Sequence, residues 1–332
     1  MVYNINDKSI IYVVCPAKKK TGGTELAHQL VNELNHLGLK SFITYYNTEN
    51  TVTPINEAFY EYVKEYKVIE DIIDSEENVL IVPEICFRIL NNYSTIQKSI
   101  WWMSVDNYVK NDGFIGACQV DGIYKSIRGV ISGRLTLRKK GFDKNIVHLY
   151  QSEYANEYLK KQGVKRRFRL SDYVNDSYLY KDGTFCSKDD IVLYNPKKGM
   201  EYTKRIMEAS QGLMWKPIVN MTSAQVKELL NKSKLYIDFG NHPGKDRFPR
   251  EAAICDCCVI TGKRGSAAYF EDVPIPDEFK FDENEDIENI VKKIKSCLDN
   301  YDEEIKKFQT YREYISNEHI IFKDDIRRLF VE

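Results

Sequence analysis

The sequence predicts an α/β protein with two doubly wound domains, each a parallel sheet covered by helices. The chain has 332 residues, which is long for one domain and sufficient for two. Short apolar runs alternate with helical patterns in both halves, as in strand–helix–strand units. Between 172 and 189 this alternation pauses in a polar stretch that contains the turn Asp182-Gly183. We therefore expect two Rossmann-like domains that face each other across a cleft.

The polar pause sets the expected boundaries. We expect an N-terminal domain over 1–172, a linker over 173–189, a second domain over 190–315, and a C-terminal helix over 316–332 that can cross back to the N-terminal domain. Ligands of open α/β sheets bind outside the carboxyl ends of the strands. The loops that follow the strands are therefore where we expect functional residues.

In the N-terminal half, apolar runs predict buried parallel strands over 10–15, 41–46, 78–82, 99–105 and 146–150. After the first strand, apolar residues recur at helical spacing, and Gly38 is placed to end that helix. A second helix is predicted over 152–162, before Gly163. This order favours a parallel sheet with crossover helices.

The second half repeats the pattern. Strands are predicted over 191–194, 217–220, 235–239 and 258–261. Helices are predicted over 200–209 and 250–255, and Thr222 and Gln225 have the spacing of a capping box that opens another helix. From Glu285 onward the chain is charged and helical. A second parallel sheet follows from this order.

The composition excludes several classes of protein. The net charge of −1 argues against a general nucleic-acid binder, so we expect no nucleic-acid partner. The eight cysteines lack the spacing of a zinc site and indicate buried residues in a reducing compartment. The sequence shows no signal peptide and no apolar run long enough to span a membrane. We therefore expect a cytoplasmic protein.

Basic residues gather in one stretch of the N-terminal half. Between Arg128 and Arg169 the sequence has twelve basic and three acidic residues. This indicates an anionic partner, either a phosphate-bearing acceptor or an anionic membrane on whose inner face the protein is peripheral. A solvated, lysine-rich surface explains the same composition equally well.

A glycine-containing loop, Gly22, Gly23, Thr24 and Glu25, lies between the first strand and its helix. Glycines there let the backbone approach a ligand, and a helix N-terminus favours anions. We expect a loop that contacts phosphate or the acceptor. The order of residues is neither a Walker loop nor a dinucleotide fingerprint, and a tight turn without a ligand is the alternative.

Two further groups of cations lie in the second half. Lys197 and Lys198 follow its first strand, beside a helix start, where they suit a diphosphate. A solvated lysine pair is the alternative. Further along, the cationic residue Arg247 precedes the helix predicted over 250–255. The strand predicted over 258–261 is followed by a loop whose backbone N–H groups and cationic side chains suit a phosphate: Lys263, Arg264, Gly265 and Ser266.

Glu251 is predicted at the start of that helix, between two buried strand ends. A carboxylate in this position is well placed to accept hydrogen bonds from ribose hydroxyls. A carboxylate that only complements the helix dipole is the alternative.

These motifs, in this order, carry a family resemblance. The resembling segments are Gly22-Gly23-x-Glu25, Gln151-Ser152-Glu153-Tyr154, Lys197-Lys198-Gly199 and Arg250-Glu251-Ala252-Ala253 with its following strand. Together they span nearly the whole chain and resemble bacterial glycosyltransferases of the GT-B fold, of the family 4-like type that builds capsule, O-antigen or exopolysaccharide. Pro243 stands where retaining members carry a second glutamate, so the stereochemical outcome stays open.

The resemblance implies that the second domain binds a nucleotide-sugar donor, whose diphosphate Lys198, Arg247 and Lys263 neutralise. It also implies that the first domain faces a glycan or lipid-diphosphate-linked acceptor, which receives the hexosyl group in surface polysaccharide synthesis. No cofactor is expected besides the donor. The usual metal-binding D-x-D signature is absent from the sequence, so we expect metal-independent transfer.

Asp106 is the candidate catalytic base. It follows the predicted strand 99–105, whose carboxyl end should point into the cleft, and a carboxylate there is suited to deprotonate an acceptor hydroxyl. An Asx turn or helix cap is the alternative. Two other functions remain open for the whole chain: a nucleotide-sugar epimerase or hydrolase of the same fold, and a two-lobed, non-catalytic sugar-binding module.

Overall fold

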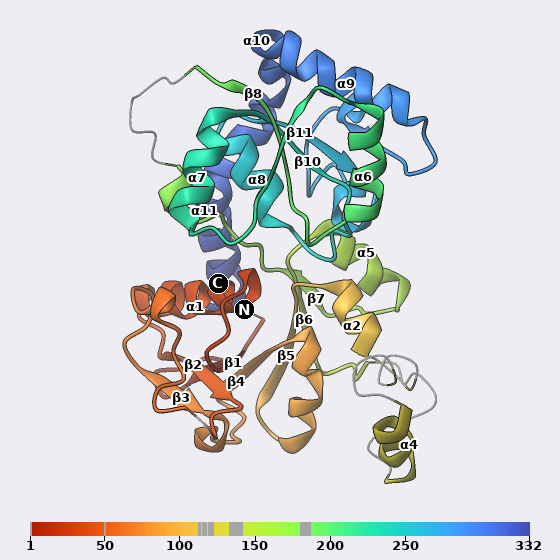
Figure 1. Cartoon of the computed structure of the whole chain (residues 1–332). Coiled ribbons are helices and arrows are strands. Elements are labelled where there is room, and N and C mark those ends of the chain that lie inside the picture. The colour runs from red at the N-terminus through yellow and green to blue at the C-terminus, as the bar shows by residue number, and fades with distance from the viewer. Residues whose placement is uncertain are drawn as a thin grey trace. The chain divides into compact units, whose positions relative to one another are not determined.

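A computed structural model describes residues 2–49, 51–111, 114, 118, 123–132, 142–179 and 187–332. The chain divides into two compact units (Figure 1): unit 1 comprises Met1–Asp172 and Ile320–Glu332, and unit 2 comprises Tyr173–His319. Parts of two sequence features, the basic stretch at 133–141 and the linker at 180–186, lie outside the described residues.

Unit 1 contains a seven-stranded, fully parallel sheet with the order β3-β2-β1-β4-β5-β6-β7. Its strands are β1 (Ile11–Pro16), β2 (Ser41–Tyr46), β3 (Tyr66–Val68), β4 (Val79–Pro83), β5 (Gln97–Trp102), β6 (Val147–Tyr150) and β7 (Arg167–Arg169). The order runs outward from β1 in both directions, which is the arrangement of a doubly wound fold.

The α-helices of unit 1 are α1 (Gly22–His36), α2 (Val105–Asn111), α4 (Ile123–Ile131) and α5 (Glu153–Lys161). Short 3₁₀ helices span Glu57–Phe59, Ile69–Asp71 and Glu84–Asn92. Helix α1 begins at Gly22, so the predicted glycine loop forms its first turn; Thr21 caps the helix, and the chain leaves it at Gly38, whose φ is +79°.

Unit 2 contains a five-stranded parallel sheet with the order β12-β11-β10-β8-β9. Its strands are β8 (Asp189–Tyr194), β9 (Met214–Pro217), β10 (Ser233–Asp238), β11 (Cys258–Gly262) and β12 (Lys280–Phe281). Its helices are α6 (Met200–Ala209), α7 (Ser223–Lys232), α8 (Arg247–Ile254), α9 (Ile287–Asp299) and α10 (Tyr301–Glu304), with 3₁₀ helices at Asp176–Tyr178, Gly265–Ala268, Asp277–Phe279 and Ile305–Phe308. The two units therefore show the predicted doubly wound α/β fold.

The division between the units falls inside the last helix, α11 (Gln309–Phe330). This helix begins earlier than the predicted 316. Its final turns belong to unit 1: Asp325 accepts a hydrogen bond from the backbone N–H of Ser171 at 3.0 Å, and Phe330 stacks on Tyr3.

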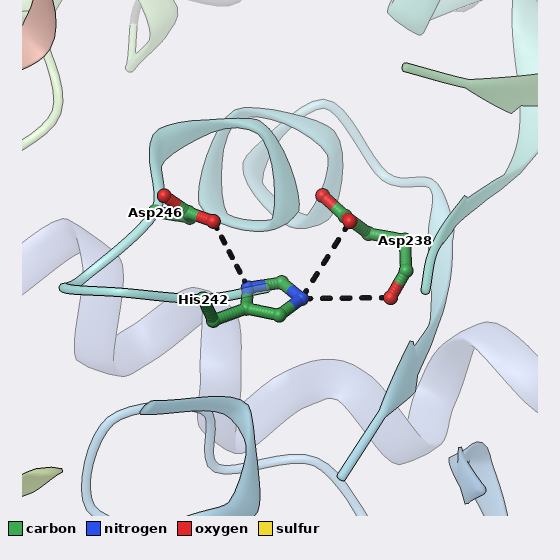
Figure 2. A group of neighbouring side chains, drawn as sticks. All are labelled: Asp238, His242 and Asp246. Atoms are coloured by element: carbon green, nitrogen blue, oxygen red, sulfur yellow. Dashed lines mark hydrogen bonds and ion pairs between the residues drawn. The ribbon is translucent and has the colours of Figure 1, made fainter. Parts of the chain in front are cut away.

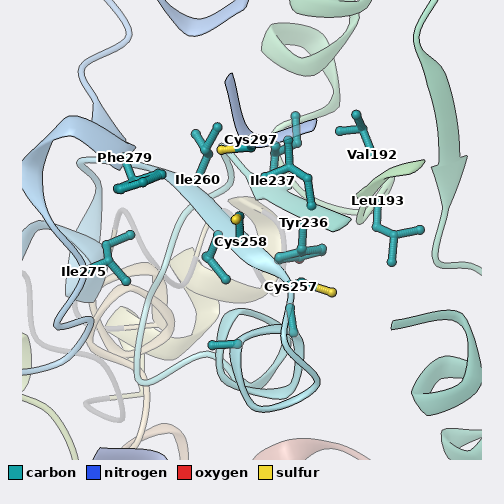
Figure 3. Packing of buried hydrophobic residues seen from close by; sticks show 14 of the residues in the cluster. Val192, Leu193, Tyr236, Ile237, Cys257, Cys258, Ile260, Ile275, Phe279 and Cys297 are labelled. Carbon is teal, nitrogen blue, oxygen red and sulfur yellow. The ribbon is translucent and has the colours of Figure 1, made fainter. Parts of the chain in front are cut away.

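The cysteines of unit 2 pack in its core, as predicted. Figure 3 shows Cys257, Cys258 and Cys297 among the apolar side chains around β10 and β11. All three are buried and free. Burial raises the pKa of Cys257 to about 11, so this thiol is protonated at neutral pH and acts as a small apolar side chain.

Several predicted boundaries were wrong. Strand β9 lies at Met214–Pro217 instead of 217–220, and alternate residues of this edge strand are exposed, which weakens its apolar signal. The three-residue strands β3 and β7 and the two-residue β12 were missed because so few residues carry no periodicity. Strand β5 ends at Trp102, before the predicted 105, because helix α2 already begins at Val105.

Candidate functional site

Three loops meet at the carboxyl edge of the unit 2 sheet. They follow β8, β10 and β11, and glycines bring their backbones together. A Cβ on Gly199 would overlap the carbonyl of Phe239, and a Cβ on Gly265 would overlap the carbonyl of His242. Both glycines also have a left-handed backbone, with φ of +60° and +54°. The three loops therefore form one packed surface at the edge where ligands of parallel sheets bind.

Lys198, from the loop after β8, forms an ion pair across this surface. Its ammonium lies 2.7 Å from the Oδ2 of Asp246, the residue that precedes helix α8. About a third of the Lys198 side chain remains exposed (34%). Its neighbour Lys197 is exposed. The structure thus separates the two predicted lysines into a positioned cation and a solvated one.

A buried histidine completes the ion-pair network (Figure 2). His242 lies in the loop after β10 with its Nδ1 3.2 Å from Asp246 Oδ2 and its Nε2 3.6 Å from Asp238 Oδ1. Its side chain is fully buried. Asp238 ends strand β10 and is held in place by the hydroxyl of Tyr236 and the backbone N–H of Gly240, which both donate to its carboxylate.

The two carboxylates set the protonation of His242. Burial lowers the pKa of His242, but the charges of Asp238 and Asp246 outweigh it, and the pKa is raised above its ordinary value. Burial likewise raises the pKa of the Asp246 carboxyl, but His242 and Lys198 outweigh it, and that pKa is lowered. The network therefore pairs two cations with two anions.

Asp238, His242 and Asp246 also satisfy the distances of a metal site, because one ligand atom from each lies within 4.8 Å of the others. Two features argue against that interpretation. The ammonium of Lys198 already lies beside Asp246 and would repel a cation. A histidine whose pKa is raised binds a proton more firmly, and a protonated imidazole is no metal ligand. We therefore interpret these residues as an ion-pair network.

Glu251 lies in the middle of helix α8, which begins at Arg247, and not at the helix start as predicted. The alternative role, a carboxylate that complements the helix dipole in the first turn, therefore does not apply to Glu251. Its side chain is largely buried (8% exposed) and forms a hydrogen bond with the hydroxyl of Tyr178. The predicted donor contact Arg247 opens the same helix and is partly exposed.

A second buried charge cluster supports this helix. Arg250 and Lys245 are buried, and both pair with Glu318 of α11, at 2.9 Å and 2.8 Å. Glu318 also accepts the backbone N–H of Val174. Because both cations are buried and paired with the same carboxylate, Lys245 and Arg250 have a structural role and are not available to a phosphate.

The residues after β11 differ from one another in accessibility. Lys263 and Arg264 are exposed and lie near the carboxylates Glu285 and Glu283. Ser266 is buried; its backbone N–H donates to the carbonyl of His242 at 2.9 Å, and its hydroxyl donates to the carbonyl of Gly244 at 2.6 Å. Ser266 thus holds the His242 loop, and its N–H cannot also wrap a phosphate as predicted.

In unit 1, the predicted phosphate or acceptor loop opens helix α1. Thr21 and Thr24 bond reciprocally as a capping box, so the Thr24 N–H is already paired. Gly22 is exposed, Gly23 lies near Met103, and the Glu25 carboxylate accepts a hydrogen bond from the Tyr62 hydroxyl at 3.0 Å.

Asp106 is the second residue of α2, so it lies in the first turn of a helix and not at a strand end. The hydroxyl of Tyr154 donates to its Oδ1 at 2.6 Å, and the side chain is partly exposed. Two loop residues separate the end of β5 from the start of α2. The position of the Asp106 carboxylate is therefore set by helix α2 and by Tyr154, and not by the sheet.

Sequence reasoning missed a second carboxyl at the same edge of unit 1. Glu84 follows strand β4, is buried, and accepts the backbone N–H of Met103 at 3.0 Å. Burial raises its pKa to about 7. On strand β6, His148 is buried and accepts a hydrogen bond from the indole N–H of Trp102, and burial lowers its pKa to about 4.

Comparison of structures shows that the chain has the GT-B fold of glycosyltransferases. HepE of Anabaena, in complex with UDP-glucose, superposes with a TM-score of 0.65 at 10% identity, covering 97% of this chain and 99% of HepE. T4 phage BGT, in complex with its UDP-glucose substrate, superposes with a TM-score of 0.51 at 11% identity. The match covers 98% of this chain and 99% of BGT.

S. aureus TarM, in complex with UDP among other ligands, gives a TM-score of 0.54 at 15% identity. The match covers 79% of this chain, and the chain spans only 57% of TarM. No protein-family model matches the sequence, and no curated protein matches it significantly. The shared property is therefore the fold.

We predict that Gly265→Ala disrupts the packed loops. Left-handed backbone alone costs about 1 kcal/mol for alanine, and the overlap with the His242 carbonyl adds roughly 1–3 kcal/mol. Gly212→Ala is the matched control, because Gly212 has φ of +90° but no heavy atom within 4 Å of the added Cβ. Urea unfolding should show a clearly larger loss for Gly265→Ala. Equal losses would mean that the loops yield to the added methyl.

Proposed function

We propose that the chain is a glycosyltransferase that transfers a hexosyl group from a UDP-sugar to a hydroxyl of a glycan or lipid-diphosphate-linked acceptor in surface polysaccharide synthesis. The observation that carries this proposal is the partly exposed side chain of Lys198, whose ammonium an ion pair positions at the carboxyl edge of the unit 2 sheet. The UDP or UDP-glucose complexes of HepE, TarM and BGT support the choice of donor.

In this proposal, unit 2 binds the donor. Lys198, with Arg247 and the exposed cations Lys197, Lys263 and Arg264, neutralises the diphosphate, and the loop at Gly265 brings backbone close to it. Glu251 accepts a ribose hydroxyl in this proposal, since a carboxylate accepts about four hydrogen bonds and one ligand oxygen can join its existing partners. Ser266 is not among the proposed donor contacts.

The reaction needs no redox partner. The acceptor oxygen forms a bond to the anomeric carbon of the sugar, the bond from that carbon to the diphosphate oxygen breaks, and UDP leaves with the bonding electron pair. Asp106 takes the proton of the acceptor hydroxyl. The cations of unit 2 stabilise the negative charge that develops on the diphosphate, which is the task that a metal performs in other transferases.

We predict acceptor-dependent release of UDP from a UDP-sugar, measured in EDTA. The cations of unit 2 supply the positive charge, so chelation should leave the rate unchanged. T4 phage BGT also has a complex with UDP and Mn²⁺, so the assay should include an arm with Mn²⁺. Activity lost in EDTA and restored by Mn²⁺ would refute metal independence.

The same assay separates the alternatives. Release of free sugar without an acceptor would indicate a hydrolase, and conversion of one UDP-sugar to another would indicate an epimerase. Binding of a UDP-sugar that stays intact under all conditions would indicate a binding module.

We predict that Lys198→Met weakens UDP-sugar binding by roughly 10–100-fold, the loss of one or two charge-assisted contacts. Methionine keeps the unbranched stem at nearly the same length but removes the charge. Lys204→Met is the matched control, because Lys204 is exposed on the neighbouring helix α6. Calorimetry should show normal affinity for the control. Equal affinity of both variants would remove Lys198 from the donor site.

We predict that Asp106→Asn lowers turnover by roughly 10²–10⁴-fold with near-normal donor affinity, because the amide cannot accept the proton. Tyr154→Phe is the comparison, since it removes the hydrogen bond to Asp106 but keeps the carboxylate. A base should tolerate Tyr154→Phe far better than Asp106→Asn. Similar losses of rate and melting temperature in both variants would assign Asp106 a structural role.

Helix α4 supports a peripheral location at the anionic inner face of a membrane. Among the described residues, every helix is too short or too polar to cross a bilayer. Yet α4 exposes an apolar face formed by Ile123 (66%), Tyr124 (75%), Ile127 (44%) and Ile131 (81%), while Ser126 and Gly129 are buried. Such an outward apolar face beside the basic stretch suits a membrane interface.

We predict that the protein sediments with anionic vesicles of phosphatidylglycerol and phosphatidylcholine and that salt weakens this binding. Ile131→Asp should reduce it roughly tenfold or more, because one apolar side chain no longer enters the interface. Ile73→Asp is the control, since Ile73 is an exposed isoleucine elsewhere in unit 1. Equal sedimentation with purely neutral vesicles would refute the membrane proposal.

A further inference from the structure

The His242 network joins the parts of unit 2 that the proposed donor site needs. Lys198 comes from the loop after β8, Asp238 from the end of β10, and Asp246 from the residue before α8. His242 lies between the two carboxylates, and Asp246 is shared between His242 and Lys198. Figure 2 shows the imidazole with one ring nitrogen directed at each aspartate.

We propose that His242 is a positioning residue whose proton makes donor binding pH-dependent: as an imidazolium it shares Asp246 with Lys198 and so leaves the ammonium of Lys198 free to bind the donor diphosphate. This inference rests on the proposed function and names a residue that acts through Lys198. Because its side chain is fully buried, His242 acts in this proposal on Lys198 and not on the donor directly.

Charge balance is the physical basis. With His242 protonated, two cations face two carboxylates, and the network is neutral. When His242 loses its proton, two carboxylates face Lys198 alone, and the network has one net negative charge. Asp246 then depends on Lys198 as its remaining cationic partner, and a diphosphate must compete with that carboxylate and overcome repulsion from the uncompensated charge.

The charged groups around His242 come from each element packed against it. Asp238, Asp246 and Lys198 are those that act on its protonation among the described residues. Tyr236 donates to Asp238 and is neutral, because its burial raises its pKa well above the ordinary value. From the loop after β11, Ser266 contributes an uncharged N–H to the His242 carbonyl.

The direction of the pH effect follows from these groups. The pKa of His242 is raised above 6.5, so the imidazolium persists at and below that pH and is lost as the pH rises through the raised value. Donor affinity should therefore be highest at about pH 6.5 and below, and it should fall in one step at a pH above 6.5.

The test is the dissociation constant of UDP-glucose, measured by calorimetry in EDTA from pH 6 to pH 9.5. The diphosphate of UDP-glucose is fully ionised across this range, and any titration of the uracil is common to all variants. For the wild type we expect affinity to fall by up to tenfold per pH unit above the step, which is the limit for loss of one proton. The step itself is measured on the unaltered protein.

Variants assign the step to His242. His242→Gln keeps polar atoms but not the charge, so we expect about tenfold weaker binding at pH 6 and no step. Asp238→Asn removes one of the two carboxylates that raise the His242 pKa, so the step should move to lower pH. His36→Gln is the matched control, because His36 is an exposed histidine of unit 1, and it should behave as wild type.

Three outcomes overturn the inference. The first is that the donor affinities of the wild type and of His242→Gln change with pH in the same way. That result would show that the proton of His242 does not affect donor binding. An unmoved step in Asp238→Asn would assign it to another group. The third outcome is that the donor-free protein binds Mn²⁺ and that His242→Gln abolishes this binding. That result would show that His242 is a metal ligand and not a protonated imidazolium.

The two proposals fail in different ways. If the wild type binds neither UDP-glucose nor UDP at any pH, the proposed function is wrong. If it binds them and His242→Gln shares its affinity and its pH curve, the proposed function stands and the role of His242 is wrong. Melting curves at each pH identify a variant that has unfolded. If His242→Gln has unfolded, the pH dependence of donor affinity in the wild type and in Asp238→Asn decides whether His242 has the proposed role.

Discussion

The close approach of three backbones at the carboxyl edge of the unit 2 sheet is the constraint on which the candidate site depends. Gly199 and Gly265 have no room for a side chain, since a Cβ on either would overlap a carbonyl of the loop after β10. This contact holds the His242 loop between its neighbours, and the two hydrogen bonds of Ser266, the residue after Gly265, fasten the same loop to the loop after β11. Only with these loops in contact can Lys198 reach Asp246.

Burial of charge explains the composition of these loops. A cation removed from water needs a carboxylate and hydrogen bonds in compensation. Unit 2 meets this need twice, with Asp238 and Asp246 around His242 and with Glu318 between Lys245 and Arg250. The second cluster ties the loop before α8 to α11. Thus some cations in this segment serve the fold, while Lys198 remains partly exposed.

This division changes how the cationic segment from Lys245 to Arg250 is understood. From the sequence alone, the cations Lys245, Arg247 and Arg250 are equally suited to bind a diphosphate. In the structure, Lys245 and Arg250 are buried against one glutamate, and Arg247 alone of the three is partly exposed. A similar distinction applies in unit 1, where Glu84 has a pKa of about 7 because it is buried, whereas Asp106 is partly exposed and bonded to Tyr154.

The sequence by itself determined the doubly wound α/β fold, because buried strands, helical spacing and caps such as Thr222 are local signals. It also placed Lys198 and the glycines at the ends of strands. The role of His242 was beyond it, since nothing in the spacing of Asp238, His242 and Asp246 shows that the loop turns back so that both aspartates face one imidazole. Likewise, the helical setting of Asp106 and Glu251 and the pairing of each cation were decided by tertiary packing, because distance and burial, which set the energy of a charge, are not local properties of a chain.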